Sequence, residues 1–187
     1  MDNTQFGQPF GGIIQVAYVV EDLHESMKNY SEKCNIGPWF YSDAYAFKEG
    51  MYRGQPTDMT MALAIGFSGH MCFELIQSID AHPSVYRDVV SKRGYGFHHL
   101  GMATKNYDAD VEKYLKMGYE LAFSGKSPRG IRFGYFDTTG DFPGMLELIE
   151  FNDSQEKFLS IMHQASLNWD GKNPVRKLES VMSLLNS

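Results

Sequence analysis

An internal repeat is the strongest constraint on the fold. Gln15–Leu23 (QVAYVVEDL) corresponds in position to His99–Tyr107 (HLGMATKNY), and Phe73–Gln77 (FELIQ) corresponds to Leu146–Glu150 (LELIE). A repeat of this size indicates a duplicated structural unit that buries its apolar face against its copy. We therefore expect two similar modules that join into one curved sheet.

The first unit reads as a strand, a helix and three more strands. β-Branched and aromatic residues fill Ile13–Val20, and Asp22 can cap a helix that stops before Gly37 and Pro38. Residues 48–58 are polar, contain Gly and Pro, and read as a loop. The three later strands are predicted at Trp39–Tyr45, Met59–Phe67 and Met71–Ile79.

The second unit repeats this order of elements. Phe97–Thr104 has the composition of a strand. Tyr107–Met117 is predicted to be a helix with Val111, Tyr114 and Leu115 facing inward. Three strands follow, at Leu121–Ser124, Ile131–Asp137 and Met145–Phe151.

Together these patterns predict an α+β fold of two tandem βαβββ modules that form a curved mixed sheet around a cleft. Helical spacing in Gln155–Trp169 and Lys177–Leu185 adds two C-terminal helices, expected on the outside of the sheet or at a subunit contact. The predicted divisions are an N-terminal arm (1–12), the first module (13–80), a linker (81–96), the second module (97–151) and a helical extension (152–187).

Composition and charge narrow the range of partners. With 187 residues, 43% of them hydrophobic, the chain can bury a full core. A net charge of −6 and the lack of a Lys/Arg cluster argue against nucleic acid, and no apolar run is long enough to span a membrane. Cys34 and Cys72 read as small core residues, so a cytoplasmic protein is expected.

Four polar side chains occupy equivalent places in the two units. Gln15 and His99 begin the first strands, and Glu74 and Glu147 lie in the last strands, each within an apolar run. Burial of an unpaired carboxylate costs several kcal/mol, so two at equivalent positions suggest a shared cation. This donor set suits five- or six-coordinate zinc, nickel, cobalt, manganese or iron. The predicted cleft is therefore a candidate metal cleft.

Strand alternation indicates which neighbours share the face of the candidate ligands. Gly101 and Ala103 fall on the side of His99, and such small residues leave room for a bound molecule. His98 is expected on the opposite face, with a structural role.

The ordered set of Gln, Glu, His and Glu resembles that of the glyoxalase and vicinal oxygen chelate superfamily, over Ile13–Phe151. It is similar to the set of glyoxalase I, and methylmalonyl-CoA epimerase has a similar mixed set. The resemblance implies a metal-dependent isomerase, epimerase or lyase that moves a proton next to a carbonyl of a small-molecule substrate. It implies Glu147 as the base and Glu74 as its catalytic partner. Val19 stands where glyoxalase I has an Arg for glutathione.

The substrate-binding candidates come from loops and strand ends, which commonly select substrates in such folds. They are Tyr45, Tyr52, Arg53 and His70. A homodimer is also expected.

Two other functions remain open from the sequence. Extradiol dioxygenases of the superfamily use iron held by two His and one Glu, and this set has one His. Bleomycin-resistance proteins bind a small molecule without a metal and usually lack the ligand set.

Overall fold

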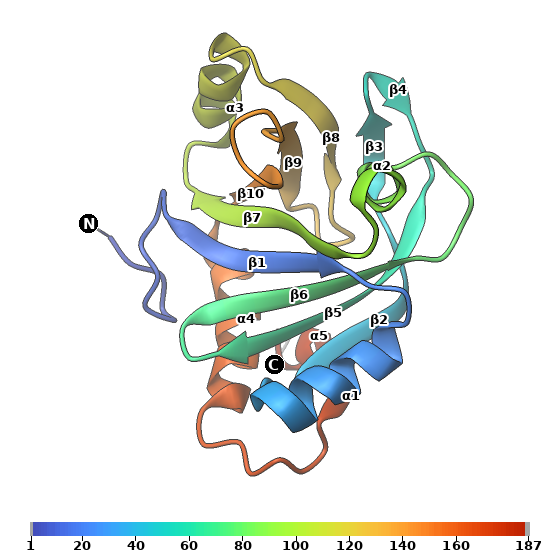
Figure 1. The fold of residues 1–187 in the computed structure, drawn as a ribbon. Coiled ribbons are helices and arrows are strands. Elements are labelled where there is room, and N and C mark those ends of the chain that lie inside the picture. Colours follow the sequence, from blue (N-terminus) through green and yellow to red (C-terminus); the bar gives the residue numbers. More distant parts are fainter. Residues whose placement is uncertain (1, 186–187) are drawn as a thin grey trace.

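The computed structural model describes residues 2–185 and contains one mixed sheet of 11 strands (Figure 1). Among the described helices, none has both the length and the apolar character required to cross a membrane. The α+β fold predicted from the repeat is confirmed, and its two modules lie side by side within this single sheet.

The first module begins with a strand that pairs in parallel with the last strand of the same module. The Asp22 carboxylate accepts a hydrogen bond from the Glu25 backbone N–H at the start of the helix, and Asn35 ends that helix in the left-handed region with a φ of 54°. The elements are β1 (Ile13–Val19), α1 (Leu23–Cys34), β2 (Trp39–Ala46), β5 (Thr60–Ser68) and β6 (Met71–Ser78).

The second module has the same order and the same pairing of its first and last strands. Its first strand also pairs with β1 in antiparallel orientation, and this pairing joins the two modules into one sheet. The elements are β7 (Gly96–Thr104), α3 (Tyr107–Lys116), β8 (Glu120–Lys126), β9 (Arg132–Asp137) and β10 (Met145–Glu150).

The segment predicted as a loop at residues 48–58 instead forms a hairpin. Its strands are β3 (Lys48–Tyr52) and β4 (Gln55–Pro56), and β3 pairs with β8 of the second module. The loop prediction was wrong because a strand can be polar when it lies at a sheet edge and pairs on one side with a distant strand. The hairpin therefore carries chain from the first module across to the second.

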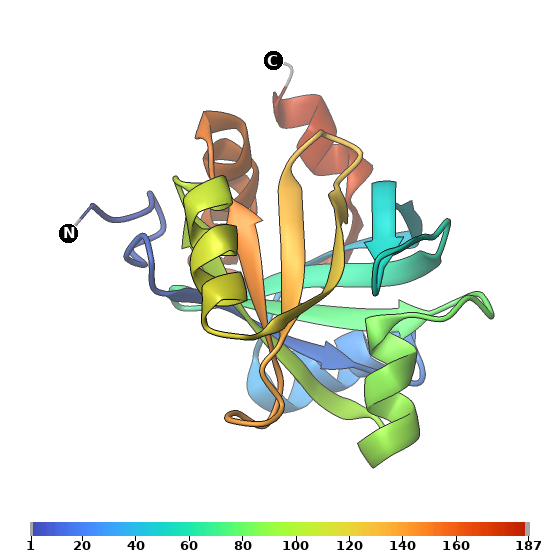
Figure 2. The ribbon, with the colours of Figure 1, turned by 90° about the horizontal axis from the view of Figure 1, so that it is seen from above.

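The two faces of the sheet are covered by different helices (Figures 1 and 2). On one face, Leu23 and Met27 of α1 pack with Trp39 and Leu75 in a small core. The larger core on the other face contains residues of both modules together with Phe158, Leu159 and Met162 of α4 (Asp153–Ser166). The C-terminal helices thus close the inner face of the curved sheet, which corrects the expectation that they pack outside it.

Three further elements complete the fold. α2 (Val85–Arg93) lies in the predicted linker, β11 (Val175–Lys177) pairs in parallel with β2, and α5 (Glu179–Leu185) follows it. The strand order is β11-β2-β5-β6-β1-β7-β10-β9-β8-β3-β4.

Two predictions about individual side chains were wrong. Leu115 is 48% exposed rather than inward-facing, because α3 contacts the sheet through other residues and has no fully buried side chain. Cys34 is exposed at the end of α1, whereas Cys72 is buried as predicted.

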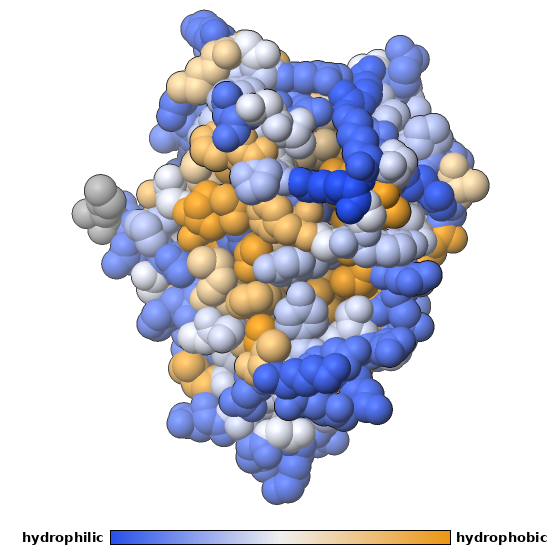
Figure 3. Space-filling model, in the orientation of Figure 1, coloured by the Kyte–Doolittle hydropathy of each residue, from blue (hydrophilic) through white to orange (hydrophobic). Residues whose placement is uncertain are grey.

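Apolar side chains are also exposed on the outer face of the sheet, over β1 and β7 (Figure 3). A hollow of about 430 Å³ there is lined by Ile13, Phe97, Leu100, Met117 and Phe142, among others. The homodimer stays a prediction.

A matched pair of variants tests the helix caps. The Asn152 side chain accepts a hydrogen bond from the Gln155 backbone N–H at the start of α4, whereas Asn106 precedes α3 without a side-chain cap bond. We expect Asn152→Ala to lower the free energy of unfolding by about 1 kcal/mol, and Asn106→Ala to lower it by much less. Urea denaturation measures both, and equal losses would contradict the assignment of the α4 cap.

Candidate functional site

The strand register gathers the four candidate ligands on one face of the sheet. Across β6, β1 and β7, the register aligns Glu74 with Ala17 and Ala17 with His99. Across β1, β7 and β10, it aligns Gln15 with Gly101 and Gly101 with Glu147. Each row therefore has a polar residue at either end and a small residue between them, and the two rows are adjacent.

The polar atoms of the four side chains are close together. Gln15 Nε2 lies 3.1 Å from Glu74 Oε2, 3.2 Å from Glu147 Oε2 and 3.2 Å from His99 Nε2. His99 Nε2 lies 3.2 Å from Glu147 Oε2 and 3.5 Å from Glu74 Oε2. Metal–ligand distances of roughly 2.0–2.2 Å place neighbouring donor atoms about 3 Å apart around one ion. The four polar ends meet at one point with spacings near this value, although residues 2–185 contain no group of three His, Cys, Asp or Glu side chains arranged as a metal site.

The Gln15 amide links the cluster. Its Nε2 group donates hydrogen bonds to Glu74 Oε2 and Glu147 Oε2 and also lies near His99 Nε2, whose donor or acceptor role depends on the tautomer. Its Oε1 accepts a weak hydrogen bond from the Cys72 thiol at 3.6 Å. Half a turn of the amide would exchange the two atoms and present Oε1 as a ligand, so Gln15 could complete the donor set of the other three residues.

Glycine is required at the centre of one row. A Cβ atom on Gly101 would lie 2.9 Å from Gln15 Cβ and 3.4 Å from Glu147 Oε2. The expectation that Gly101 faces the candidate ligands is confirmed, and any larger residue would displace Gln15.

Burial dominates the electrostatics of the cluster. It raises the pKa of the Glu74 carboxyl well above its usual range, and the nearby Glu147 raises it further. Burial also raises the pKa of Glu147 to about 8 and lowers the pKa of His99 to about 3. The surroundings thus disfavour every charge in the cluster when no cation compensates the carboxylates.

His98 lies next to His99 and not on the opposite face of the strand. The pairing of β1 with β7 shifts between Ala17 and Tyr18, where two residues of β1 face three of β7, so His98 occupies a β-bulge. The Nδ1 atoms of the two histidines are 2.8 Å apart. The alternation argument was wrong here because a bulge interrupts the period of two. His98 therefore holds the ring of His99 with its Nε2 towards the glutamates.

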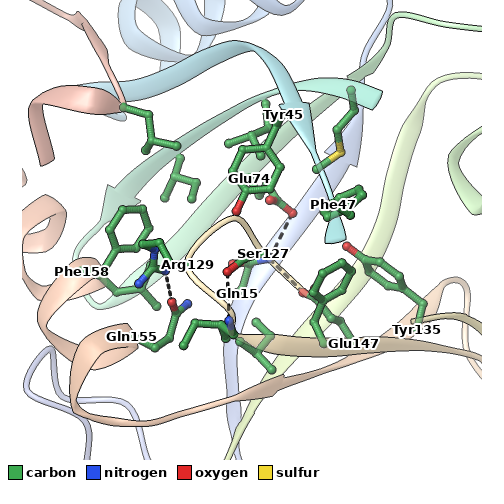
Figure 4. A pocket seen from close by; sticks show the side chains of 18 residues that line it. Gln15, Tyr45, Phe47, Glu74, Ser127, Arg129, Tyr135, Glu147, Gln155 and Phe158 are labelled. Atoms are coloured by element: carbon green, nitrogen blue, oxygen red, sulfur yellow. Dashed lines mark hydrogen bonds between the residues drawn. The ribbon is translucent and has the colours of Figure 1, made fainter. Parts of the chain in front are cut away.

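Beside the cluster lies a partly open cavity of about 80 Å³ between the sheet and α4 (Figure 4). Gln15, Glu74 and Glu147 line one part of it, and Tyr135 lies beside Glu147. Most of the remaining wall is apolar, formed by Phe47, Met61, Leu63, Ile65, Ile131, Phe133, Ile149, Phe158, Leu159 and Leu178. An apolar cavity with a few convergent polar groups is typical of a small-molecule site.

Of the four substrate-binding candidates, only Tyr45 lines this cavity. Arg53 instead forms ion pairs with Asp88, Glu120 and Asp137, which tie the β3–β4 hairpin to α2 and the second module. The Tyr52 hydroxyl donates a hydrogen bond to Asp88.

His70 also lies away from the cavity. Its ring is exposed at the turn between β5 and β6 and is 5.6 Å from the ring of His163. His163 is buried beside Phe67 and is likewise outside the cavity lining.

The sequence reasoning missed three polar residues of the cavity wall, Ser127, Arg129 and Gln155. Ser127 and Arg129 belong to the turn Ser127-Pro128-Arg129-Gly130 between β8 and β9, and Gln155 lies in the first turn of α4. The turn between β8 and β9 could have indicated Ser127 and Arg129, because loops at strand ends often carry substrate contacts.

Comparison with known proteins gives one family and a consistent fold. Residues 14–135 match the Glyoxalase/Bleomycin resistance protein/Dioxygenase superfamily. A search of curated proteins finds no significant match.

Several solved structures are similar in fold. A hypothetical protein from Bacillus halodurans aligns with a TM-score of 0.58 and 13% identity, covering 76% of this chain and 95% of its own. Methylmalonyl-CoA epimerase from Mycobacterium tuberculosis aligns with a TM-score of 0.56 and 17% identity, covering 77% and 90%. A Streptomyces coelicolor methylmalonyl-CoA epimerase in complex with 2-nitronate-propionyl-CoA aligns with a TM-score of 0.54 and 15% identity. This alignment covers 78% of this chain and 97% of the epimerase chain.

The raised carboxyl pKa values predict how stability depends on pH without metal. Above about pH 7.5, His99 is almost fully neutral in both states, whereas the unfolded chain has released the Glu147 proton that the folded protein keeps up to about pH 8. The free energy of unfolding therefore falls between about pH 7.5 and 8, where the histidine no longer opposes the effect of Glu147. We expect Glu147→Gln to make this fall shallower, as measured by urea denaturation in chelator. The control Glu112→Gln, on the exposed face of α3, should keep the wild-type slope.

Proposed function

Because the chain belongs to the glyoxalase/bleomycin resistance protein/dioxygenase superfamily, we propose that it is an enzyme that binds a divalent metal through Gln15, Glu74, His99 and Glu147. The observation that carries this proposal is the meeting of four polar groups, two from each module, beside a largely apolar cavity. Without a cation, burial favours the protonated form of both carboxyl groups, and a bound cation would stabilise their charged form.

The proposed reaction is proton transfer at a carbon next to a carbonyl, as in an isomerase, epimerase or lyase. A divalent ion would supply Lewis-acid polarisation of the carbonyl. Glu147 acts as the base, because its carboxyl lines the cavity at the cluster and so lies within reach of a bound substrate. Glu74 reaches the same space from β6, so it can exchange a proton on the other side of the substrate.

The similar solved structures support this class of reaction. They include methylmalonyl-CoA epimerases, one of them in complex with methylmalonyl-CoA. Their identity to this chain is at most 17% in these alignments, so the substrate proposed here is a chemical class, a small or thioester-borne acid with an acidic C–H bond.

The position of His98 bears on the dioxygenase alternative. That chemistry would need a second histidine at the metal, but His98 contacts Nδ1 of His99, whereas the Nε2 atom of His99 is the one that faces the glutamates. Oxygen uptake with a catechol after loading with ferrous iron would support the dioxygenase. Tight binding of a small molecule in the presence of chelator would support a metal-free binding protein.

The first test is the metal content of the purified protein and of two histidine variants. We expect about one divalent metal per chain by elemental analysis and its loss in His99→Ala, because His99 supplies the one imidazole of the set. The matched control is His163→Ala, which removes a buried histidine outside the cavity and should keep the metal. A wild-type protein without metal, even after reloading, would contradict the proposal.

The second test concerns the base. Glu147→Gln should slow exchange of a substrate α-proton with deuterated water by roughly 10²- to 10⁴-fold, since it removes a positioned base. Exchange is followed by NMR across a panel of acyl thioesters and hydroxyketones. An unchanged exchange rate would assign the proton transfer to another residue.

A further inference from the structure

We propose that Arg129 binds a carboxylate of the substrate. This contact would orient the substrate so that its carboxylate lies away from Glu147. This inference deepens the proposed function and rests on it for the identity of the reacting end. The binding of a carboxylate at Arg129 can be tested independently of any metal.

Arg129 lies between the cavity and the outside of the protein. It lines the cavity beside the candidate ligands and also a neighbouring outer depression of about 210 Å³. Tyr45, Phe158 and Leu178 line both spaces as well. These four residues therefore form the wall between the cavity and the outer depression, and a substrate that enters from this side passes Arg129.

The guanidinium is held in place by contacts that leave its charge without a partner. It lies 3.7 Å from the centre of the Phe158 ring, and its Nη2 donates a hydrogen bond to Gln155 Oε1. Nη1 approaches the Ser154 carbonyl oxygen at 3.5 Å. Within residues 2–185, Arg129 forms no ion pair; Glu179 also lines the outer depression but is not paired with it.

Of the described residues that line the cavity, Arg129 is the only Lys or Arg. Burial lowers its pKa, and Tyr45 is the neighbour that partly opposes this effect. An anionic ligand would supply the missing countercharge. Because the guanidinium is planar and stacked on Phe158, its free N–H groups form a fork that matches a carboxylate.

The polar groups of the cavity are separated by charge. In Figure 4, Arg129 and Gln155 lie on one side, and Glu147 and Tyr135 lie on the other. Two glutamates repel an anionic group near them, while Arg129 attracts it at the opposite side. The cavity thus favours one orientation of a small acid, with its uncharged part directed towards Glu147.

The experiment compares pentanoate with pentanamide, which have the same shape and differ in charge. Binding to the protein in chelator at pH 6.5 is measured by NMR titration. We expect the wild type to prefer pentanoate by roughly 10- to 100-fold, the effect of a hydrogen-bonded charge pair. In Arg129→Gln the two affinities should become equal, and Arg129→Lys should restore part of the preference.

Arg176→Gln is the matched control, because Arg176 also lies over an aromatic ring, that of Phe40, but is outside the cavity lining. It should keep the wild-type preference. The proposal is overturned if the wild type binds neither probe, shows no preference, or keeps its preference in Arg129→Gln. Failure of the metal-dependent function would appear separately, as absence of metal in the wild type with the preference for pentanoate intact.

Discussion

The antiparallel pairing of β1 with β7 determines where every candidate ligand lies. It aligns Ala17 with His99 and Gln15 with Gly101, and the parallel partners β6 and β10 add Glu74 and Glu147 to the same two rows. Because side chains alternate along a strand, a slip of one residue at this pairing would turn half of the set to the other face. The buried carboxylates and the apolar core therefore depend on the same register.

Much of this arrangement could be predicted from the repeat. A duplicated unit identifies equivalent positions, and polar residues at equivalent positions inside apolar runs indicate a shared site between the copies. The positions of Gln15, Glu74, His99 and Glu147 in one cluster follow from that reasoning, as does the small residue at Gly101. Their role as metal ligands stays a proposal.

The parts that the sequence did not reveal depend on pairing between distant segments. The bulge at His98 arises from the register of β7 against β1, and no local sequence pattern predicts it. The β3–β4 hairpin forms because β3 can pair with the edge of β8. Arg53 lies outside the cavity lining because it forms ion pairs with acidic residues far along the chain. The sequence did not indicate Arg129 because a single arginine in a turn is usually solvated. Its position in the cavity wall depends on its contacts with Gln155 and Phe158 of α4.

The repeated modules carry the candidate ligands, whereas elements outside the repeat form part of the cavity wall. The repeat supplies a nearly symmetric pair of rows, and a symmetric set of ligands cannot by itself distinguish one end of a substrate from the other. The asymmetry comes from elements outside the repeat. Phe47, between β2 and the hairpin, packs on Phe123 and Phe133 over one part of the cavity, and α4 places Gln155 and Phe158 beside Arg129 at another. Changes in these added elements can therefore alter substrate selection while the register that positions the candidate ligands stays intact.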